Sequence, residues 1–163
     1  MCINRLRDHQ QHGATTVEMA IVLPLFLMII FGIIEFSIML YDKAMVTNAA
    51  REGSRFAGLW APTIDDDSYK YTCGQINGVI NNWLSNNLIS FSNSDVPNIT
   101  ISQTDSSNAI TTCSSSSQIL CNKSDDIIII SIEYHYTFLI PYFFDKSNKG
   151  IPLTSVSRMK CEH

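Results

Sequence analysis

The sequence lacks the common signatures of catalysis and of phosphate binding. It contains no Gly-x-Ser-x-Gly turn that would present a nucleophilic serine, and no glycine-rich loop that would hold a phosphate group. Its four histidines are scattered, and His135 lies between two tyrosines in a strand-like run. That position is more typical of packing or of a surface residue than of a general base. We therefore expect no enzyme activity and no cofactor.

Positive charge and clustered metal ligands are also scarce. The chain has 11 lysines and arginines against 15 acidic residues, a net charge of -4, and no block of basic residues. Such a chain offers no basic face to a phosphate backbone, so we expect no nucleic-acid binding. No Cys-x-x-Cys pair occurs, and the aspartates at 65–67 lack the further oxygen ligands of a calcium loop. The sequence therefore predicts no metal site.

What the chain does have is one long hydrophobic run. Met19 to Tyr41 carries a single charge, Glu35. Its roughly 23 residues would form a helix about 35 Å long, enough to cross a hydrocarbon core of about 30 Å. Arg5 and Arg7 precede the run, so the positive-inside bias places the N-terminus in the cytoplasm and the rest of the chain outside. The sequence therefore predicts a single transmembrane helix in contact with the lipid bilayer.

The residues before this run differ from those of a secretory signal peptide. A signal peptide has its small-residue cleavage site after the apolar segment, whereas Gly13 precedes the segment here and is followed by Ala14-Thr-Thr-Val-Glu18. A cut between Gly13 and Ala14 would leave the helix on the mature protein and create an ammonium group at Ala14. Helices packed side by side with an axial offset would let Glu18 of one subunit neutralise the ammonium of another. Glu18 is therefore a candidate for setting register in an assembly.

Glu35 is the second acidic residue that needs an explanation. A carboxylate within a membrane span is costly unless it is paired, protonated or close to the interface. From its place about six residues before Tyr41, Glu35 could reach the outer interface or face a protein partner. Both interpretations stay open, and Glu35 joins Glu18 as a candidate assembly residue.

The helical pattern continues past the hydrophobic run. No proline occurs in residues 42–57. Four residues at spacings of three or four share one face of this stretch: Met45, Ala49, Gly53 and Phe56. Small residues on this face allow another backbone to approach closely, from a partner or from the protein's own outer domain. We predict one continuous helix from about Thr16 to Ala57, stopped before Pro62.

Four motifs in this order resemble the N-terminal signature of TadE-like pseudopilins. They are Gly13-Ala-Thr-Thr-Val-Glu-Met-Ala20, Ile21-Val-Leu-Pro-Leu25, Gly32-Ile-Ile-Glu-Phe36 and Asn48-Ala-Ala-Arg-Glu-Gly-Ser-Arg-Phe-Ala57. Proteins of this family are minor pilin-like components of the tight adherence (Flp pilus) system of bacteria, a type IVb pilus system. The resemblance covers residues 13–57 well and residues 58–163 only in outline.

The resemblance implies processing, partners and a location. A membrane aspartyl prepilin peptidase would cleave after Gly13, and the mature chain would lie in the bacterial inner membrane or, after processing, in the fibre. Its partners would be the major Flp-type pilin, sister pseudopilins and the inner-membrane pilus assembly platform, in the service of adhesion and biofilm formation. The chain has Glu18-Met19 where major pilins of the system have Glu-Tyr, and its outer domain is larger. Both differences argue for a minor subunit.

Beyond the helix the sequence predicts an α+β domain. An amphipathic helix is expected at 75–88, a short strand at 99–103, and an exposed Ser/Thr-rich loop at 105–117. The strongest strand is expected at 126–140, and residues 151–161 should return antiparallel to it. The expected architecture is a small antiparallel sheet packed on the long helix.

These predictions divide the chain into four parts. Residues 1–13 form a cytoplasmic leader, 14–41 the transmembrane helix, 42–58 its extension, and 59–163 an extracytoplasmic α+β domain.

The cysteines indicate an oxidising compartment. Cys2 would leave with the leader, so four cysteines remain in the exported chain: Cys73, Cys113, Cys121 and Cys161. An even number in a small exported domain predicts two disulfides. One pairing joins Cys73 to Cys113 and Cys121 to Cys161. The other joins Cys113 to Cys121 and Cys73 to Cys161.

A second class of function remains open on sequence grounds. The chain could be an unprocessed single-pass anchor that presents a periplasmic binding or sensor domain. Only the pseudopilin interpretation requires both Gly13 and Glu18.

Overall fold

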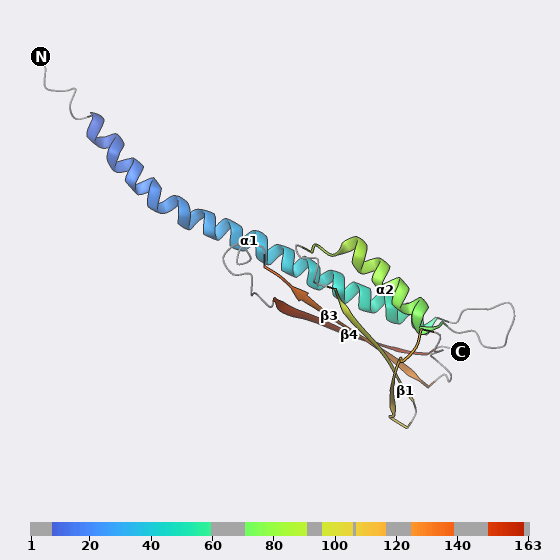
Figure 1. Cartoon of the computed structure of the whole chain (residues 1–163). Helices are drawn as coiled ribbons and strands as arrows, with labels where there is room; N and C mark the ends of the chain where they lie inside the picture. Colours follow the sequence, from blue (N-terminus) through green and yellow to red (C-terminus); the bar gives the residue numbers. More distant parts are fainter. Residues whose placement is uncertain are drawn as a thin grey trace, which may run out of the picture. The chain divides into compact units, whose positions relative to one another are not determined.

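The protein combines a long apolar helix with a small α+β domain. The computed structural model describes residues 8–59, 71–90, 96–105, 107–116, 125–138 and 150–161. The elements of this part of the chain, in order, are α1 (Asp8–Gly58), α2 (Cys73–Asn87), β1 (Asn98–Thr104), β2 (Ile110–Thr112), β3 (Ile127–Tyr136) and β4 (Ile151–Lys160) (Figure 1). The predicted α+β class is confirmed. The chain divides into two compact units, residues 1–37 and 38–163.

The first unit is helical from Asp8 onward, and its apolar side chains are exposed. Ile21 and Met28, for example, are 72% and 73% exposed. The most apolar stretch of the helix has a mean hydropathy of 2.7, and none of it is buried. Leaving this much apolar surface in water would be costly. The helix is long and apolar enough to cross a membrane, which is consistent with a single-pass membrane protein.

Helix α1 begins earlier than the sequence predicted. It starts at Asp8 instead of Thr16, so Gly13 and Ala14 lie inside it. Glycine at 13 and threonines at 15 and 16 are weak helix formers, which made a later start plausible, but one interior glycine costs only about 1 kcal/mol relative to alanine. Pro24 lies within the helix as well.

In the second unit, the small residues of α1 pack on the protein's own domain. Ala49, Ala50 and Gly53 are buried, together with Val46 one turn earlier. A Cβ atom placed on Gly53 would lie 2.5 Å from Cγ1 of Ile80 in α2. The stripe of small residues therefore brings α1 close to its own neighbours. Of the two uses that the sequence left open, the structure has the contact with the outer domain.

The four strands form one antiparallel sheet in the order β2-β1-β3-β4. The predicted pairing of the last two strands is confirmed, with Ile130 opposite Ser157 in the register. Along β3, alternate residues are buried: Ile128, Ile130, Ile132, Tyr134 and Tyr136. This period of two gives the sheet one buried face, and both helices of the domain lie on the same side of it (Figure 1).

Two predicted element boundaries were wrong. The expected loop at 105–117 contains strand β2, and β3 ends at Tyr136 instead of residue 140. The turn before β2 is formed by Asp105, whose Oδ1 accepts hydrogen bonds from the backbone N–H groups of Ser107 and Ala109, each at 3.0 Å. All three residues of β2 are exposed, so no hydrophobic alternation marked the strand. Pro62, Pro141 and the predicted turn at 65–67 lie outside the described residues.

The tight packing at Gly53 predicts a large loss of stability on substitution. In Gly53→Val, the new side chain would overlap Ile80, which is fully buried and stiff because it is β-branched. We expect the free energy of unfolding of the outer domain to fall by about 1–3 kcal/mol. Chemical denaturation of the full-length chain in detergent micelles, followed by circular dichroism, measures the change.

Gly78→Ala is the matched control. Gly78 lies in α2 with no atom within 4 Å of an added Cβ, so alanine should stabilise the helix by up to about 1 kcal/mol. Equal stability of both variants and the wild type would contradict the packing argument.

Candidate functional site

The Gly13–Ala14 bond lies in an exposed part of α1. Gly13 is exposed, and an added Cβ at this position would meet no atom within 4 Å. The fold therefore places no steric limit on residue 13. Any requirement for glycine here must come from another molecule, since the chain itself does not impose it.

The two candidate assembly glutamates have opposite surroundings. Glu18 is exposed, whereas Glu35 is only 6% exposed, between Ile34 at 46% and Phe36 at 57%. The sequence placed Glu35 at the membrane interface or against a partner, but its side chain is buried within the chain. Seventeen residues of helix separate the two glutamates, a rise of about 26 Å. They therefore belong to different sites, and only Glu18 is free to meet another subunit.

Asp42 is a buried carboxylate that the sequence did not single out. It is 0% exposed, and its Oδ1 accepts a hydrogen bond from the backbone N–H of Ile89 at 3.0 Å. Its Oδ2 is buried and has no hydrogen-bond partner. Burial raises the pKa of Asp42 above its ordinary value, and the bond from Ile89 opposes the rise. Because Asp42 follows the hydrophobic run directly, it resembled an ordinary polar residue at the end of a span.

Two further contacts join α1 to strand β4. The Nζ atom of Lys43 donates a hydrogen bond to the backbone carbonyl of Thr154. Farther along the helix, the hydroxyl oxygens of Ser54 and Ser157 lie 2.7 Å apart. Together with the buried apolar residues, these contacts fix residues 42–58 of α1 on the sheet.

A disulfide between Cys73 and Cys113 joins the start of α2 to the residue after β2, with a Cα–Cα distance of 6.5 Å. This pair occurs in the first of the two predicted pairings and is incompatible with the second. Cys161 is also disulfide-bonded, and Cys121 lies outside the described residues. The bond follows a capping box, in which Thr72 and Gln75 exchange hydrogen bonds at the helix N-terminus.

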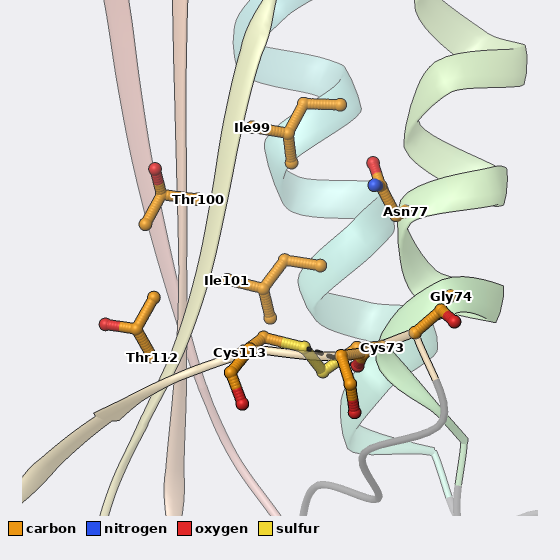
Figure 2. Close-up of a pocket in the computed structure, with 11 residues that line it drawn as sticks. Cys73, Gly74, Asn77, Ile99, Thr100, Ile101, Thr112 and Cys113 are labelled. Atoms are coloured by element: carbon orange, nitrogen blue, oxygen red, sulfur yellow. Dashed lines mark hydrogen bonds between the residues drawn. A yellow bond between two sulfur atoms is a disulfide. The ribbon is translucent and has the colours of Figure 1, made fainter.

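A cavity of about 300 Å³ lies beside this disulfide. Figure 2 shows Ile99 and Ile101 of β1 pointing toward the helix that carries Asn77, while Thr100 and Thr112 point to the other side. The remaining lining comes from both cysteines, Gly74 and Ser114–Ser116. No titratable acid, base or lysine lines the cavity, so it offers no general acid, base or charged nucleophile.

No other chemical cluster emerges from the described ranges. There, no group of three or more His, Cys, Asp or Glu side chains could hold a metal ion. His135 is a surface residue, 3.7 Å from Glu133, and both side chains are about half exposed.

With the geometry described, comparison with known families becomes informative. Residues 13–55 match the family model described as TadE-like protein. This segment of the chain is TadE-like. The resemblance predicted from the four motifs is thus confirmed over these residues. No curated protein and no solved structure matches the chain.

The TadE-like segment includes the residues that the candidate sites share. It begins at Gly13, contains both Glu18 and Glu35, and runs through Asp42 and Gly53. It therefore combines the exposed apolar helix with the part of α1 that carries the outer domain. The disulfide and the cavity lie in the part of the chain beyond the family match.

The disulfide beyond the TadE-like segment predicts a measurable contribution to stability. Cys73 and Cys113 are 40 residues apart, so the bond restricts a large loop in the unfolded chain. The double substitution Cys73→Ser with Cys113→Ser should lower the free energy of unfolding by about 2–4 kcal/mol. Denaturation of the full-length variant in micelles measures this loss. An unchanged midpoint would contradict a structural role for the bond.

Proposed function

We propose that this chain is a minor pseudopilin of the tight adherence (Flp) pilus apparatus, processed after Gly13. The observation that carries the proposal is the TadE-like match at residues 13–55. It falls on a helix with an exposed apolar surface and an exposed Glu18 near its beginning. The combination suits a subunit that leaves the bilayer and packs its helix against those of other subunits.

In this proposal, the apolar helix has two successive environments. In the bilayer its exposed side chains face lipid, and in an assembly the same side chains face neighbouring helices. The Glu18 carboxylate would pair with the ammonium group that processing creates at Ala14 of a neighbour. Residues 42–58 of the helix would hold the outer domain on the extracytoplasmic side, through the contacts with α2 and β4 described above.

The partners follow from this role. They are a prepilin peptidase, the major Flp-type pilin, sister pseudopilins and an inner-membrane assembly platform. The chain itself has no catalytic role in the proposal. Pilus assembly, with adhesion and biofilm formation as its consequences, is the function.

One observation favours the second candidate, an unprocessed membrane anchor that presents an outer binding domain. The Gly13–Ala14 bond lies within α1, and a helical backbone must unwind before it can enter a peptidase in an extended form. The two candidates differ in the mature N-terminus: Ala14 for the pseudopilin, and a residue before Gly13 for the anchor.

Deletion of the chain in its host tests the proposed function. Cells without it should lose surface pili in electron micrographs and should attach less to surfaces, and the intact chain supplied in trans should restore both. Normal pili in the deletion strain would contradict the proposal.

A further inference from the structure

Asp42 joins two segments that lie far apart in the sequence. Its Oδ1 accepts the backbone N–H of Ile89, 47 positions along the chain, at 3.0 Å. Ile89 immediately follows Leu88, the residue that caps α2. The Asp42 side chain is therefore the point at which α1 holds the connection between α2 and β1.

This connection depends on the hydrogen bond more than on side-chain burial. The side chain of Ile89 is 39% exposed and Ser90 is exposed, whereas Leu88 is half-buried against the core. Few buried contacts and one side-chain-to-backbone bond are typical of a segment that opens locally at low cost. The strength of the bond to Asp42 thus determines how firmly residues 88–90 stay on α1.

The charged groups around Asp42 do not neutralise it. On α1, Glu35 lies two turns earlier, and the neighbouring Lys43 donates to the carbonyl of Thr154 instead. Helix α2 carries no charged residue at all. On the sheet, Glu133 of β3 is near His135, and Lys160 of β4 pairs with Asp125 at 3.0 Å. Arg158 is exposed on β4. No ion pair to Asp42 is formed within the described ranges.

We propose that Asp42 and Ile89 form a proton-controlled clasp that is closed when Asp42 is protonated and loosens when it ionises. In the closed form, the proton on Oδ2 removes the charge from a fully buried carboxyl whose second oxygen has no partner. In the open form, residues 88–90 leave α1 and the carboxylate reaches water. The clasp lies directly after Tyr41, where the hydrophobic run ends, and the inference does not depend on the proposed pilus function.

The direction of the pH dependence follows from linkage. Burial raises the pKa of Asp42 in the closed form above its ordinary value of 3.8, which applies to the open form. Below that ordinary value both forms are protonated, and the clasp has its full stability. As the pH rises toward the raised pKa, only the open form ionises readily, so the opening equilibrium increases by about tenfold per pH unit. Above the raised pKa both forms are ionised, and the equilibrium becomes constant again.

Amide hydrogen exchange of the full-length chain in lipid nanodiscs tests the clasp. The protection factor of the Ile89 amide, corrected for the intrinsic pH dependence of exchange, should fall by tenfold or more between pH 4 and pH 8. The Leu88 amide is the internal reference, because its hydrogen bond to the carbonyl of Leu84 involves no titrating group. A constant protection factor at Ile89 would overturn the proposal.

Two variants separate the proton effect from a merely structural bond. Asp42→Asn keeps an oxygen that accepts the Ile89 N–H but cannot ionise, so its protection should be constant across the same range. Asp42→Ala should lose the protection at every pH. If Asp42→Asn shows the same fall as the wild type, the titrating group is another residue and the clasp is wrong.

Direct titration keeps the proposal falsifiable if a variant fails to fold. The carboxyl carbon of Asp42, observed by nuclear magnetic resonance in the unmodified protein, should titrate with a midpoint above 3.8 that coincides with the fall in Ile89 protection. A midpoint at or below the ordinary value would overturn the proposal.

Discussion

Cells carrying Glu18→Gln should produce the chain, insert it into the membrane and yet fail to assemble normal pili. Glutamine keeps the shape of the side chain and removes its charge, so the Ala14 ammonium of a neighbour would lose its partner. If that pair is buried in the assembly, breaking it costs about 3–5 kcal/mol. A loss of this size abolishes a weak lateral contact between helices. Electron microscopy of cell-surface pili measures the outcome.

The fold itself should not respond to this substitution. Glu18 is exposed and lies in the first unit of the chain, away from the disulfide-bonded domain of residues 38–163. Glu18→Gln and Glu18→Ala should therefore keep the stability of the outer domain and the cut after Gly13. Glu52→Gln is the matched control, because Glu52 is an exposed glutamate on the same helix beyond the hydrophobic run. Normal pili in the Glu18→Gln strain would contradict the role of Glu18 in register.

Glu35→Gln addresses a different question. From the sequence alone, a carboxylate at the membrane interface should tolerate glutamine better than Glu18 does. The structure buries Glu35 to 6% exposure, so the substitution removes a charge from the interior of the chain. A defect in Glu35→Gln would therefore report on the local structure of the helix, whereas a defect in Glu18→Gln with intact folding would report on assembly.

The elements that the sequence predicted well have strong periodic patterns. The run of isoleucines and tyrosines in β3 alternates between the two faces of the sheet, and its pairing with β4 followed from adjacency in the chain. The helix α2 was predicted to within two residues at its start because Ile76, Ile80 and Leu84 recur at helical spacing. In each case the buried face is visible in the sequence as a period.

The missed features have no such pattern. Strand β2 is three exposed residues held by its pairing with β1, so backbone hydrogen bonds define it without a hydrophobic signal. The bond between Asp42 and Ile89 spans 47 positions, and neither residue suggests the other. The early start of α1 was missed because weak helix formers at 13, 15 and 16 suggested a boundary. Contacts between distant segments and exposed edges are decided by tertiary structure, which local propensity does not contain.

The candidate site was predictable where its chemistry is local. Gly13, Ala14 and Glu18 lie within six residues, and their order relative to the hydrophobic run carries the argument. The family match at residues 13–55 covers the same stretch. Asp42 was not predictable as a functional residue, because its significance lies in its complete burial and in an oxygen without a partner. Those properties appear only when the outer domain packs on α1.

Gly13→Leu should leave the full-length chain in host membranes, while the wild type begins at Ala14. Leucine at 13 meets no atom of the chain itself, because nothing lies within 4 Å of an added Cβ. A failure to process would therefore arise at the peptidase and not from misfolding. Mass spectrometry of the N-terminus, in cells that contain the peptidase, measures the result. Gly32→Leu is the matched control, since Gly32 is a second glycine of the same helix with the same open surroundings, and it should be processed normally.

Gly13→Ala separates two reasons for the expected failure. Leucine both adds a bulky side chain and favours the helix, whereas alanine adds one methyl group and favours the helix most strongly. If the peptidase requires a small residue, Gly13→Ala should be cleaved far better than Gly13→Leu. If it requires the helix to unwind at Gly13, both variants should resist cleavage alike, because α1 runs through this bond. Normal processing of Gly13→Leu, or an unprocessed wild type in the presence of the peptidase, would contradict the pseudopilin assignment and favour the plain membrane anchor.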